Sequence, residues 1–439
     1  MDTGLDPGAV AGPVARGARR GSPGTTRTLP PALPYELFDC LQVNLAVLAD
    51  RWHGAGTHLG LGAALRFTPV TGADGLPTVA RTVEQHLADA RSALGIEVRS
   101  LHRTSGAAGI PLTEGCYVVA DAYHLPWVPY FQQRHMEHSF LAEAAGQDGQ
   151  DGVSGPDSPD GVSGPDSPDG VSVLDGYHNE TPWGSARPGR WSLSAHDLLA
   201  AVPGPALVAE LAPAAGGPGA VAATADLAGP GAVDAYVDAY ARHPDRNAAL
   251  GRLTLETWFL ARSRRLHAAF LAASGAAPDS AVDAHVRAWG ALTEQTYLAA
   301  RRVERGRTEP PGLLPRLREQ LHADGALLGT ALAAAPAVGD AAGPPAAVGA
   351  ELRGAVAAVA AAVLGTAVGP LLDGRSLGEV PQFSSFRIVE IIERLEEELR
   401  FEFDAADLVP ENLHDIDAIC AIVRRSPSAG PALARLGES

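Results

Sequence analysis

A cysteine at the start of an amphipathic helix is the feature that most constrains this chain. Between Phe38 and His53, leucines and a tryptophan recur at three- and four-residue steps, which predicts a helix with one apolar face. Pro34 and Asp39 stand where such a helix would begin, so Cys40 falls in its first turn. The free amides and the dipole of a helix start favour a thiolate. Cys40 is therefore either an activated nucleophile or a small, packed apolar residue.

Length and composition limit the classes of function. The chain has 439 residues, which predicts two or three domains, and 46% of them are hydrophobic. A formal net charge of −17 argues against nucleic acid as a partner. The three cysteines are far apart and odd in number, so we expect no disulfide framework and a cytoplasmic location. No apolar run reaches the length of a membrane span, so a membrane is not an expected partner either.

Composition and periodicity change several times along the chain. The expected divisions are a disordered tail (1–30), a domain of strands and helices (31–193), a helical extension (194–333), a linker (334–347), a second helical domain (348–426) and a tail (427–439). The tail at 1–30 and the linker are rich in Ala, Gly and Pro and lack periodicity, which is typical of unstructured segments.

A predicted hairpin carries a histidine and an aspartate. Residues alternate between polar and apolar from His138 onward, and residues 171–177 predict the strand that returns beside them. Between them, residues 151–168 are two perfect copies of a nine-residue unit rich in turn formers, which predicts a mobile loop insertion. Antiparallel pairing would place His138 near one end of the hairpin and Asp175 on the neighbouring strand.

The order Cys40, His138, Asp175 fits a papain-like catalytic arrangement. In such a site the imidazole takes the thiol proton, and the carboxylate fixes the tautomer and orientation of the ring. His135 lies three residues before His138 and competes for the role of base. We prefer His138 because it begins the alternating strand.

Several short segments follow one another in a characteristic order. They are Asp39-Cys40, Gly60 to Phe67, Val119 to Trp127, His138-Ser139-Phe140 and Val173-Leu174-Asp175. As a set they resemble the N-terminal domain of the butirosin-biosynthesis acyltransferase family. The helical stretch from Trp258 to Phe270 looks like that family's usual extension, so the resemblance covers about residues 35–330.

This resemblance implies a fold, an activity and a set of site residues. The fold would be an α+β papain-like cysteine domain followed by an all-α extension. The activity would move an aminoacyl group from a carrier-protein thioester to an amine of an aminoglycoside. Cys40 matches the family's nucleophile, His138 its catalytic histidine and Asp175 the residue that orients the histidine. The resemblance implies no metal.

A second possible site lies near the C-terminus. From Leu377 to Leu399, loop residues lead to a serine at a helix start and then to an amphipathic helix. The expected inward positions are Phe386, Val389, Ile392 and Leu395, and the expected acidic outer positions are Glu390, Glu393, Glu397 and Glu398. Taken alone, this pattern predicts only a capped, solvated helix.

The wider order of elements adds a second resemblance. A first helix from Glu351 to Leu364, a long loop to Ser385, the segments 401–404 and 408–413 and a last helix through Ile416, Ile419 and Val423 follow in turn. They resemble an acyl carrier protein over about residues 348–426. The resemblance implies a four-helix acyl-carrier-type bundle with 4′-phosphopantetheine on Ser385. The usual Gly-x-Asp-Ser motif is altered, with Gln382 and Ser384 in place of its Gly and Asp.

Together these features predict an acyltransferase fused to its own carrier domain. A phosphopantetheinyl transferase, an acyl-loading enzyme and a small-molecule amine or hydroxyl acceptor would be its partners. Two alternatives stay open. The chain could be a non-catalytic carrier or scaffold, or a thioesterase or amide hydrolase in which water replaces the acceptor.

The register of the last acidic helix generates a first prediction. Carrier domains place the modified serine immediately before the first inward position, which is Phe386 here, so Ser385 and not Ser384 should carry the arm. We expect Ser385→Ala to abolish the added mass after incubation with coenzyme A and a permissive phosphopantetheinyl transferase. Ser384→Ala should keep it, and Ser384→Asp should increase it, because a carboxylate complements a helix N-terminus. Intact-mass measurement decides; an added mass that survives only in Ser385→Ala contradicts the register.

Overall fold

The structure is a computed structural model. It describes residues 33–145, 170–276, 280–331, 350–380, 383, 385–403, 407–408 and 412–426. The predicted tails, repeat loop and linker lie outside these residues, as do Ser384 and Gln382.

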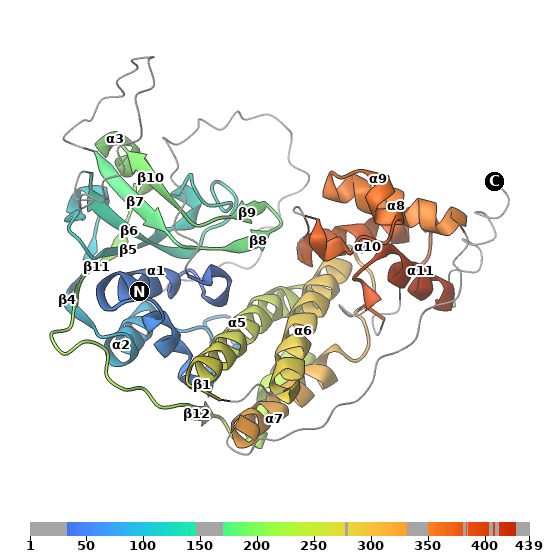
Figure 1. The fold of residues 1–439 in the computed structure, drawn as a ribbon, viewed down its shortest axis with the longest axis horizontal. Coiled ribbons are helices and arrows are strands. Elements are labelled where there is room, and N and C mark those ends of the chain that lie inside the picture. Colours follow the sequence, from blue (N-terminus) through green and yellow to red (C-terminus); the bar gives the residue numbers. More distant parts are fainter. Residues whose placement is uncertain are drawn as a thin grey trace, which may run out of the picture. The chain divides into compact units, whose positions relative to one another are not determined.

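The fold is α+β, as the sequence predicts, and it forms two compact units (Figure 1). The first unit comprises Met1–Thr68, Val79–Asp226 and Arg262–Ala276. The second comprises Pro69–Thr78, Leu227–Ala261 and Ala277–Ser439. The predicted domain boundaries stay predictions.

A six-stranded sheet is the centre of the first unit. Its strand order is β10-β7-β6-β5-β11-β4, and all neighbouring strands are antiparallel. The strands are β4 (Ile96–Thr104), β5 (Cys116–Asp121), β6 (Glu137–Ala144), β7 (Val171–Asp175), β10 (Gly189–Leu193) and β11 (Ala206–Pro213). The predicted hairpin is confirmed, since β6 pairs with β7 and Leu141 lies opposite Leu174. In the neighbouring pair, His138 lies opposite Ala120 of β5.

Strands also occur where the sequence predicts only helices. The expected helical pattern from 194 to 333 is wrong at β11 and at β12 (Thr224–Leu227), which pairs with β1 (Ala64–Phe67). The first half of β11 is a short run of buried apolar residues, and such a run does not distinguish a buried strand from a helix. Because β11 pairs with β5 on one side and with β4 on the other, it is a strand despite the helix preference of its alanines.

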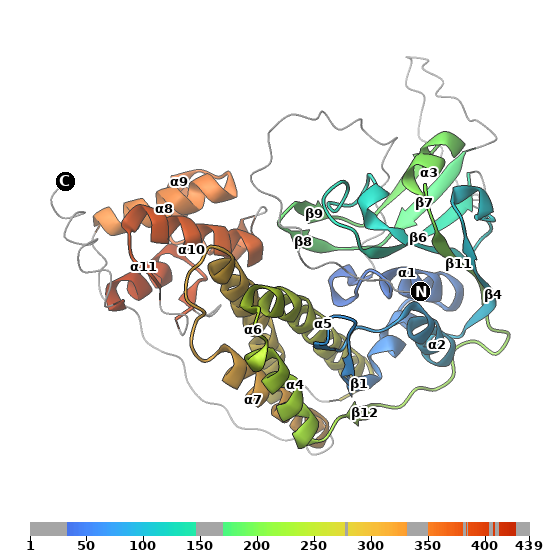
Figure 2. The same cartoon turned by 180° about the vertical axis from the view of Figure 1, so that it is seen from behind.

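Helices cover the sheet of the first unit. Helix α1 (Val43–His53) lies against it and contacts β6, β7 and β11 (Figure 1; Figure 2 shows the opposite side). Helix α2 (Val83–Ala93) begins where Thr82 and Gln85 form a capping box, which fixes its first turn. The remaining elements of this unit are α3 (Ala195–Ala201), β8 (Asn179–Thr181), β9 (Gly184–Ala186) and four 3₁₀ segments, Tyr35–Leu37, Thr57–Gly62, Ala107–Gly109 and Ala122–His124.

The second unit begins with a short hairpin and long helices. The hairpin is β2 (Val70–Thr71) with β3 (Pro77–Thr78), and the helices are α4 (Pro230–Arg242), α5 (Arg246–Ala273), α6 (Ser280–Glu304) and α7 (Leu313–Ala331). Helix α5 enters the first unit at Arg262. The buried carboxylate of Glu256 holds helix and hairpin together, because it accepts hydrogen bonds from Arg252 at 3.0 Å and from Thr78 at 2.7 Å.

The C-terminal helices of this unit share one apolar core. They are α8 (Ala350–Leu364), α9 (Val368–Leu372), α10 (Ser385–Leu399) and α11 (Ile416–Arg425), with a 3₁₀ segment at Leu377–Glu379. Val389, Ile392 and Leu395 of α10 are buried in this core, which confirms three of the predicted inward positions. The side chain of Glu396 is buried as well, which the sequence pattern did not predict.

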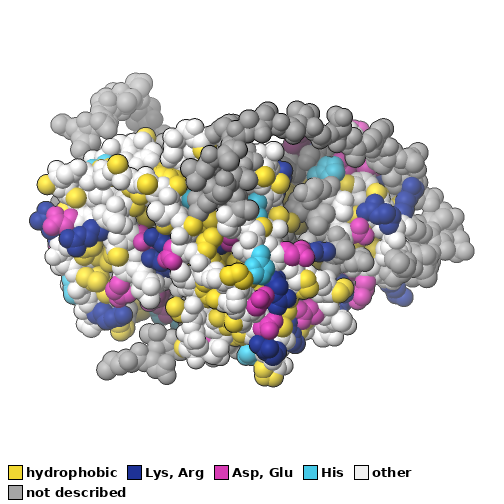
Figure 3. All heavy atoms as spheres, turned by 90° about the horizontal axis from the view of Figure 1, so that it is seen from below, with side chains coloured by type: hydrophobic (Ala, Val, Ile, Leu, Met, Phe, Trp, Pro, Cys, Tyr) yellow, Lys and Arg dark blue, Asp and Glu magenta, His cyan; other side chains and the backbone are white. Residues whose placement is uncertain are grey.

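One face of the molecule mixes charges rather than separating them. On the face drawn in Figure 3, arginine side chains lie next to acidic ones, with hydrophobic atoms scattered between them. Among the helices that the structure describes, none has the length and apolar character needed to cross a membrane.

Candidate functional site

The turn that carries Cys40 is built by the residue before it. Oδ1 of Asp39 accepts hydrogen bonds from the backbone amides of Leu41 and Gln42, both at 2.8 Å, and so caps the turn that leads into α1. Cys40 therefore lies in this turn, three residues before α1 begins at Val43, and not in the first turn of the helix as predicted. Its sulfur is 3.6 Å from the carbonyl oxygen of Glu137, to which the thiol donates. This contact places the sulfur beside the residue that precedes His138.

His138 and Asp175 form a buried pair across β6 and β7. Nε2 of His138 is 2.7 Å from Oδ2 of Asp175, and the two residues are 0% and 2% exposed. Asp175 also accepts from Nε1 of Trp127 at 3.1 Å and from the amide of Tyr177 at 2.8 Å. An ionised carboxylate only accepts hydrogen bonds, so Nε2 is the protonated nitrogen of the neutral ring. Among the described residues, the buried Nδ1 has no hydrogen-bond partner, so this nitrogen is left to act as a base.

Asn44 links the cysteine helix to both strands of the pair, and the sequence analysis missed it. Its Nδ2 donates to the carbonyl and the hydroxyl of Ser139 at 2.9 and 3.0 Å. Its Oδ1 accepts from the amide of Gly176 at 3.0 Å. The hydroxyl of Ser139 donates in turn to the carbonyl of Cys40. One fully buried amide thus fixes α1 relative to the residues that follow His138 and Asp175.

The same region requires a glycine after the aspartate. A Cβ atom at Gly176 would lie 2.8 Å from a methyl carbon of Val43, closer than such atoms approach in proteins. The ring of Tyr35 would be 3.4 Å away. Glycine at this position therefore lets α1 approach the end of β7.

Arg262 clamps the loops on either side of the site. This buried side chain donates to the carbonyl of Phe38, two residues before Cys40. It also donates to the carbonyl of His178 at 2.8 Å and to Oδ1 of Asn179 at 3.2 Å. One guanidinium therefore holds both the segment before the cysteine and the segment after the aspartate.

The electrostatics of the cysteine differ from the expectation. Burial raises the pKa of the Cys40 thiol well above its ordinary value, and the nearby carboxylates of Asp39 and Asp175 raise it further. A backbone hydrogen bond at Cys40 lowers it, but by less than burial raises it. Burial therefore opposes the thiolate that the helix start was expected to favour.

His135, the competing base, lies elsewhere. It is exposed, its Nδ1 is 2.6 Å from Oδ2 of Asp121, and its ring stacks on Tyr123 at a centroid distance of 4.2 Å. Of the two histidines, His138 is the one that the structure brings together with Asp175.

In the second unit, Ser385 is the first residue of α10, at the helix start that the sequence predicts. The chain places it after a turn in which the amide of Phe383 donates to the carbonyl of Val380 at 2.8 Å. Within the described part of the chain, no group of three or more His, Cys, Asp or Glu residues could hold a metal ion.

Comparisons with known proteins give no identification. No protein-family model matches the chain, and no curated protein matches it. The two resemblances therefore stay expectations, and function has to be argued from the geometry of the residues.

The clamp generates a stability prediction. Arg262→Met should lower the free energy of unfolding by roughly 2 kcal/mol or more. The substitution leaves two carbonyl groups without their donor, and each buried carbonyl that loses its donor costs about 1–3 kcal/mol. Arg265→Met is the matched control, since Arg265 is exposed on the same helix and should change stability by at most about 0.5 kcal/mol. Chemical denaturation of both variants provides the measurement, and equal effects would show that the clamp adds nothing.

The raised thiol pKa generates a pH prediction. A group with a raised pKa is protonated at neutral pH, so the thiolate fraction of Cys40 should still be rising at pH 9. Alkylation of Cys40 by iodoacetamide should therefore increase with pH by about tenfold per unit without a plateau near neutrality. Peptide mass spectrometry follows Cys40, with buried Cys116 and Cys420 as internal references. A plateau between pH 6 and 8 would instead mean that a thiolate–imidazolium pair already exists at rest.

Proposed function

We propose that this protein is a cysteine acyltransferase that moves an acyl or aminoacyl group from a thioester donor to an amine or hydroxyl acceptor. The observation that carries the proposal is the buried pair of His138 and Asp175, with Nδ1 of the histidine unpaired and the sulfur of Cys40 beside the preceding residue. We propose a papain-like fold for this domain, and the packing of α1 against β6 and β7 supports it.

In the first half-reaction, Nδ1 of His138 takes the proton of the Cys40 thiol. The sulfur attacks the carbonyl carbon of the thioester, a new C–S bond forms, and the C–S bond to the donor thiol breaks. The leaving thiolate receives the proton from His138. Asp175 stabilises the imidazolium while it exists, and its bonds from Trp127 and Tyr177 keep it oriented.

In the second half-reaction, the acceptor attacks the acyl group on Cys40. His138 removes a proton from the attacking amine or hydroxyl and returns it to the sulfur as the thiol leaves. Because burial raises the pKa of Cys40, the thiol needs a base to remove its proton near neutral pH, and His138 would be that base. This arrangement keeps the nucleophile neutral until a substrate is present.

The C-terminal helices are proposed to be an acyl-carrier-type bundle. Ser385 would hold 4′-phosphopantetheine, which supplies a thiol for the acyl thioester when bound. The residues present fit this group, since a hydroxyl-bearing residue begins α10 and glutamates follow along that helix. Glu393, Glu396 and Glu397 pair with arginines of this chain, so a modifying transferase would have to bind nearer the start of α10.

One observation favours a second candidate, a non-catalytic scaffold. Cys40 is only 8% exposed and its thiol pKa is raised, which also describes a cysteine that merely packs. A protein that hydrolyses its thioester would differ again, since it would release free acid at the same rate with or without an amine.

Variants of the pair test the proposal. We expect wild-type protein to acquire an acyl group on Cys40 from a small acyl thioester, and Cys40→Ser to acquire none, because a hydroxyl is a much weaker nucleophile at the same place. His138→Asn should slow acylation by about a hundredfold or more, the usual contribution of a general base. The exposed His135→Asn is the matched control and should stay within about threefold of wild type.

Single-turnover intact-mass measurements give the acylation rate, and product analysis with and without an amine separates transfer from hydrolysis. Absence of acylation in folded wild-type protein supports the scaffold. A His138→Asn rate equal to that of wild type contradicts the assigned base.

A further inference from the structure

We infer that the C-terminal end of α6 is a docking surface for an acidic helix of a carrier-type domain, and that its occupant in this chain is α10. The surface consists of Arg301, Arg302, Arg305 and Arg307, called here the α6 arginine cluster. The inference goes beyond the proposed function, because it requires neither acylation of Cys40 nor modification of Ser385.

The centre of the contact is a buried carboxylate between two guanidinium groups. The side chain of Glu396 is 1% exposed; its Oε1 lies 2.9 Å from Nη1 of Arg302 and its Oε2 lies 2.6 Å from Nη1 of Arg307. The amide of Phe403 donates to Oε1 at 3.1 Å. A buried charge needs such partners, so this glutamate is stable only with the α6 arginine cluster in place.

A second set of ion pairs runs beside the first. Nη2 of Arg305 lies 2.9 Å from Oε2 of Glu393, and its Nη1 lies 3.6 Å from Glu397. Nε of Arg301 is 3.8 Å from the other oxygen of Glu393. Positions 393, 396 and 397 share one face of α10, whereas Arg301 and Arg302 lie in the last turn of α6 and Arg305 directly follows that helix. Two complementary sets of opposite charge therefore meet at this end of α6.

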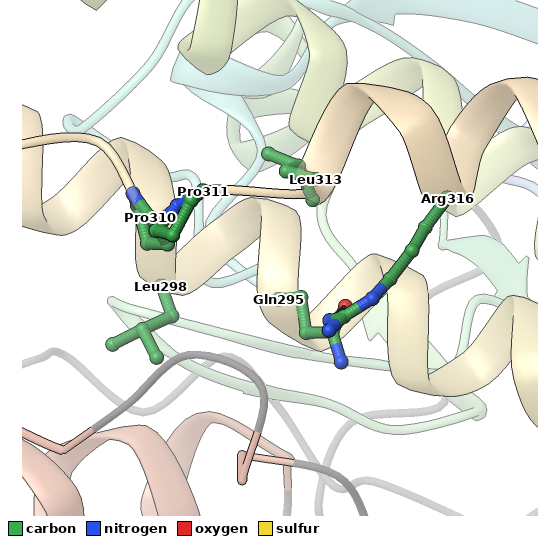
Figure 4. Close-up of a pocket in the computed structure, with 6 residues that line it drawn as sticks. All are labelled: Gln295, Leu298, Pro310, Pro311, Leu313 and Arg316. Atoms are coloured by element: carbon green, nitrogen blue, oxygen red, sulfur yellow. Dashed lines mark hydrogen bonds between the residues drawn. The ribbon is translucent and has the colours of Figure 1, made fainter.

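Apolar and neutral contacts extend the surface toward the middle of α6. Leu298 belongs to the apolar core of the C-terminal helices, and Tyr297 packs against that core. Nε2 of Gln295 donates to the carbonyl of Leu408 at 3.4 Å. Figure 4 shows Gln295 and Leu298 on α6, with Arg316 reaching across from α7 to Gln295, whose Oε1 it contacts at 2.9 Å. An apolar centre beside charged groups is the usual composition of a specific interface.

Among the described residues, the ion pairs of this contact lie on the second half of α10. Every ion pair recorded between α10 and the α6 arginine cluster involves Glu393, Glu396 or Glu397. Ser385 lies eight residues before Glu393, about 12 Å along the axis at about 1.5 Å per residue. The ion pairs with the α6 arginine cluster thus lie about two helical turns or more from the first residue of α10.

A cleavable full-length chain tests the inference. A specific protease sequence inserted within residues 334–347 allows the chain to be cut after folding, and gel filtration then reports whether the fragments stay together. We expect co-elution at low ionic strength and gradual separation as salt is raised, because part of the contact is ionic.

Charge reversal identifies the surface. Arg305→Glu and Glu393→Arg should each weaken the fragment complex by at least tenfold, and the combined variant should restore it, since it re-forms the pair in the opposite sense. Glu390→Gln is the control, because Glu390 pairs with Arg387 and Arg394 on its own helix. Circular dichroism of the uncut chains confirms that each variant folds.

The outcomes are distinct. Separation of wild-type fragments at low ionic strength overturns the inference, as does an Arg305→Glu complex as stable as that of wild type. Acylation is not measured here, so a failure of the docking surface and a failure of the proposed acyltransferase are told apart.

Discussion

The buried amide of Asn44 is the interaction on which the arrangement of the candidate site depends. The cysteine lies on the turn before α1, whereas its two partners lie on strands β6 and β7. A directional contact is therefore needed to fix how far α1 is shifted along its axis, and rotated about it, relative to these strands. Apolar packing alone is non-directional. Asn44 supplies direction, because its donors reach Ser139 and its acceptor reaches Gly176. Loss of such a buried bond costs about 1–3 kcal/mol, which is large beside a total stability of about 5–15 kcal/mol.

Around this link the site keeps charge to a minimum. Asp175 accepts from three donors, and burial raises the pKa of the Cys40 thiol, so the thiol adds no negative charge beside this carboxylate at rest. Two further charges arise only if His138 takes the thiol proton. Both charges would lie beside the carboxylate of Asp175, which stabilises the positive charge on the imidazolium. A buried, neutral nucleophile is therefore compatible with catalysis when its base is already oriented.

The sequence predicts a helix or strand correctly where the periodicity of that segment determines its structure. It fails where contacts with residues far along the chain determine the structure. Helix α1, the β6–β7 hairpin and α10 follow from periods that their own residues show. The position of β11 does not, because an alanine-rich run becomes a strand only between two others. Arg262 donates to a carbonyl 224 residues earlier, which no local pattern encodes. A signal for Asn44 did exist, since it is a polar residue beside Leu41, Leu45 and Leu48 on the apolar face of its helix.

The α6 arginine cluster fixes the position of α10 by directional polar contacts, as Asn44 fixes the position of α1. The chain contains no lysine, so apart from histidine every positive side chain is an arginine, whose planar donors suit buried carboxylates better than an ammonium does. A buried ion pair such as Arg302 with Glu396 adds little net stability, because desolvation offsets the attraction. Its effect is on register: a slip of α10 along α6 would leave both charges buried without partners. Asn44 and Glu396 thus act alike, since each makes one relative position of two elements far more stable than its neighbours.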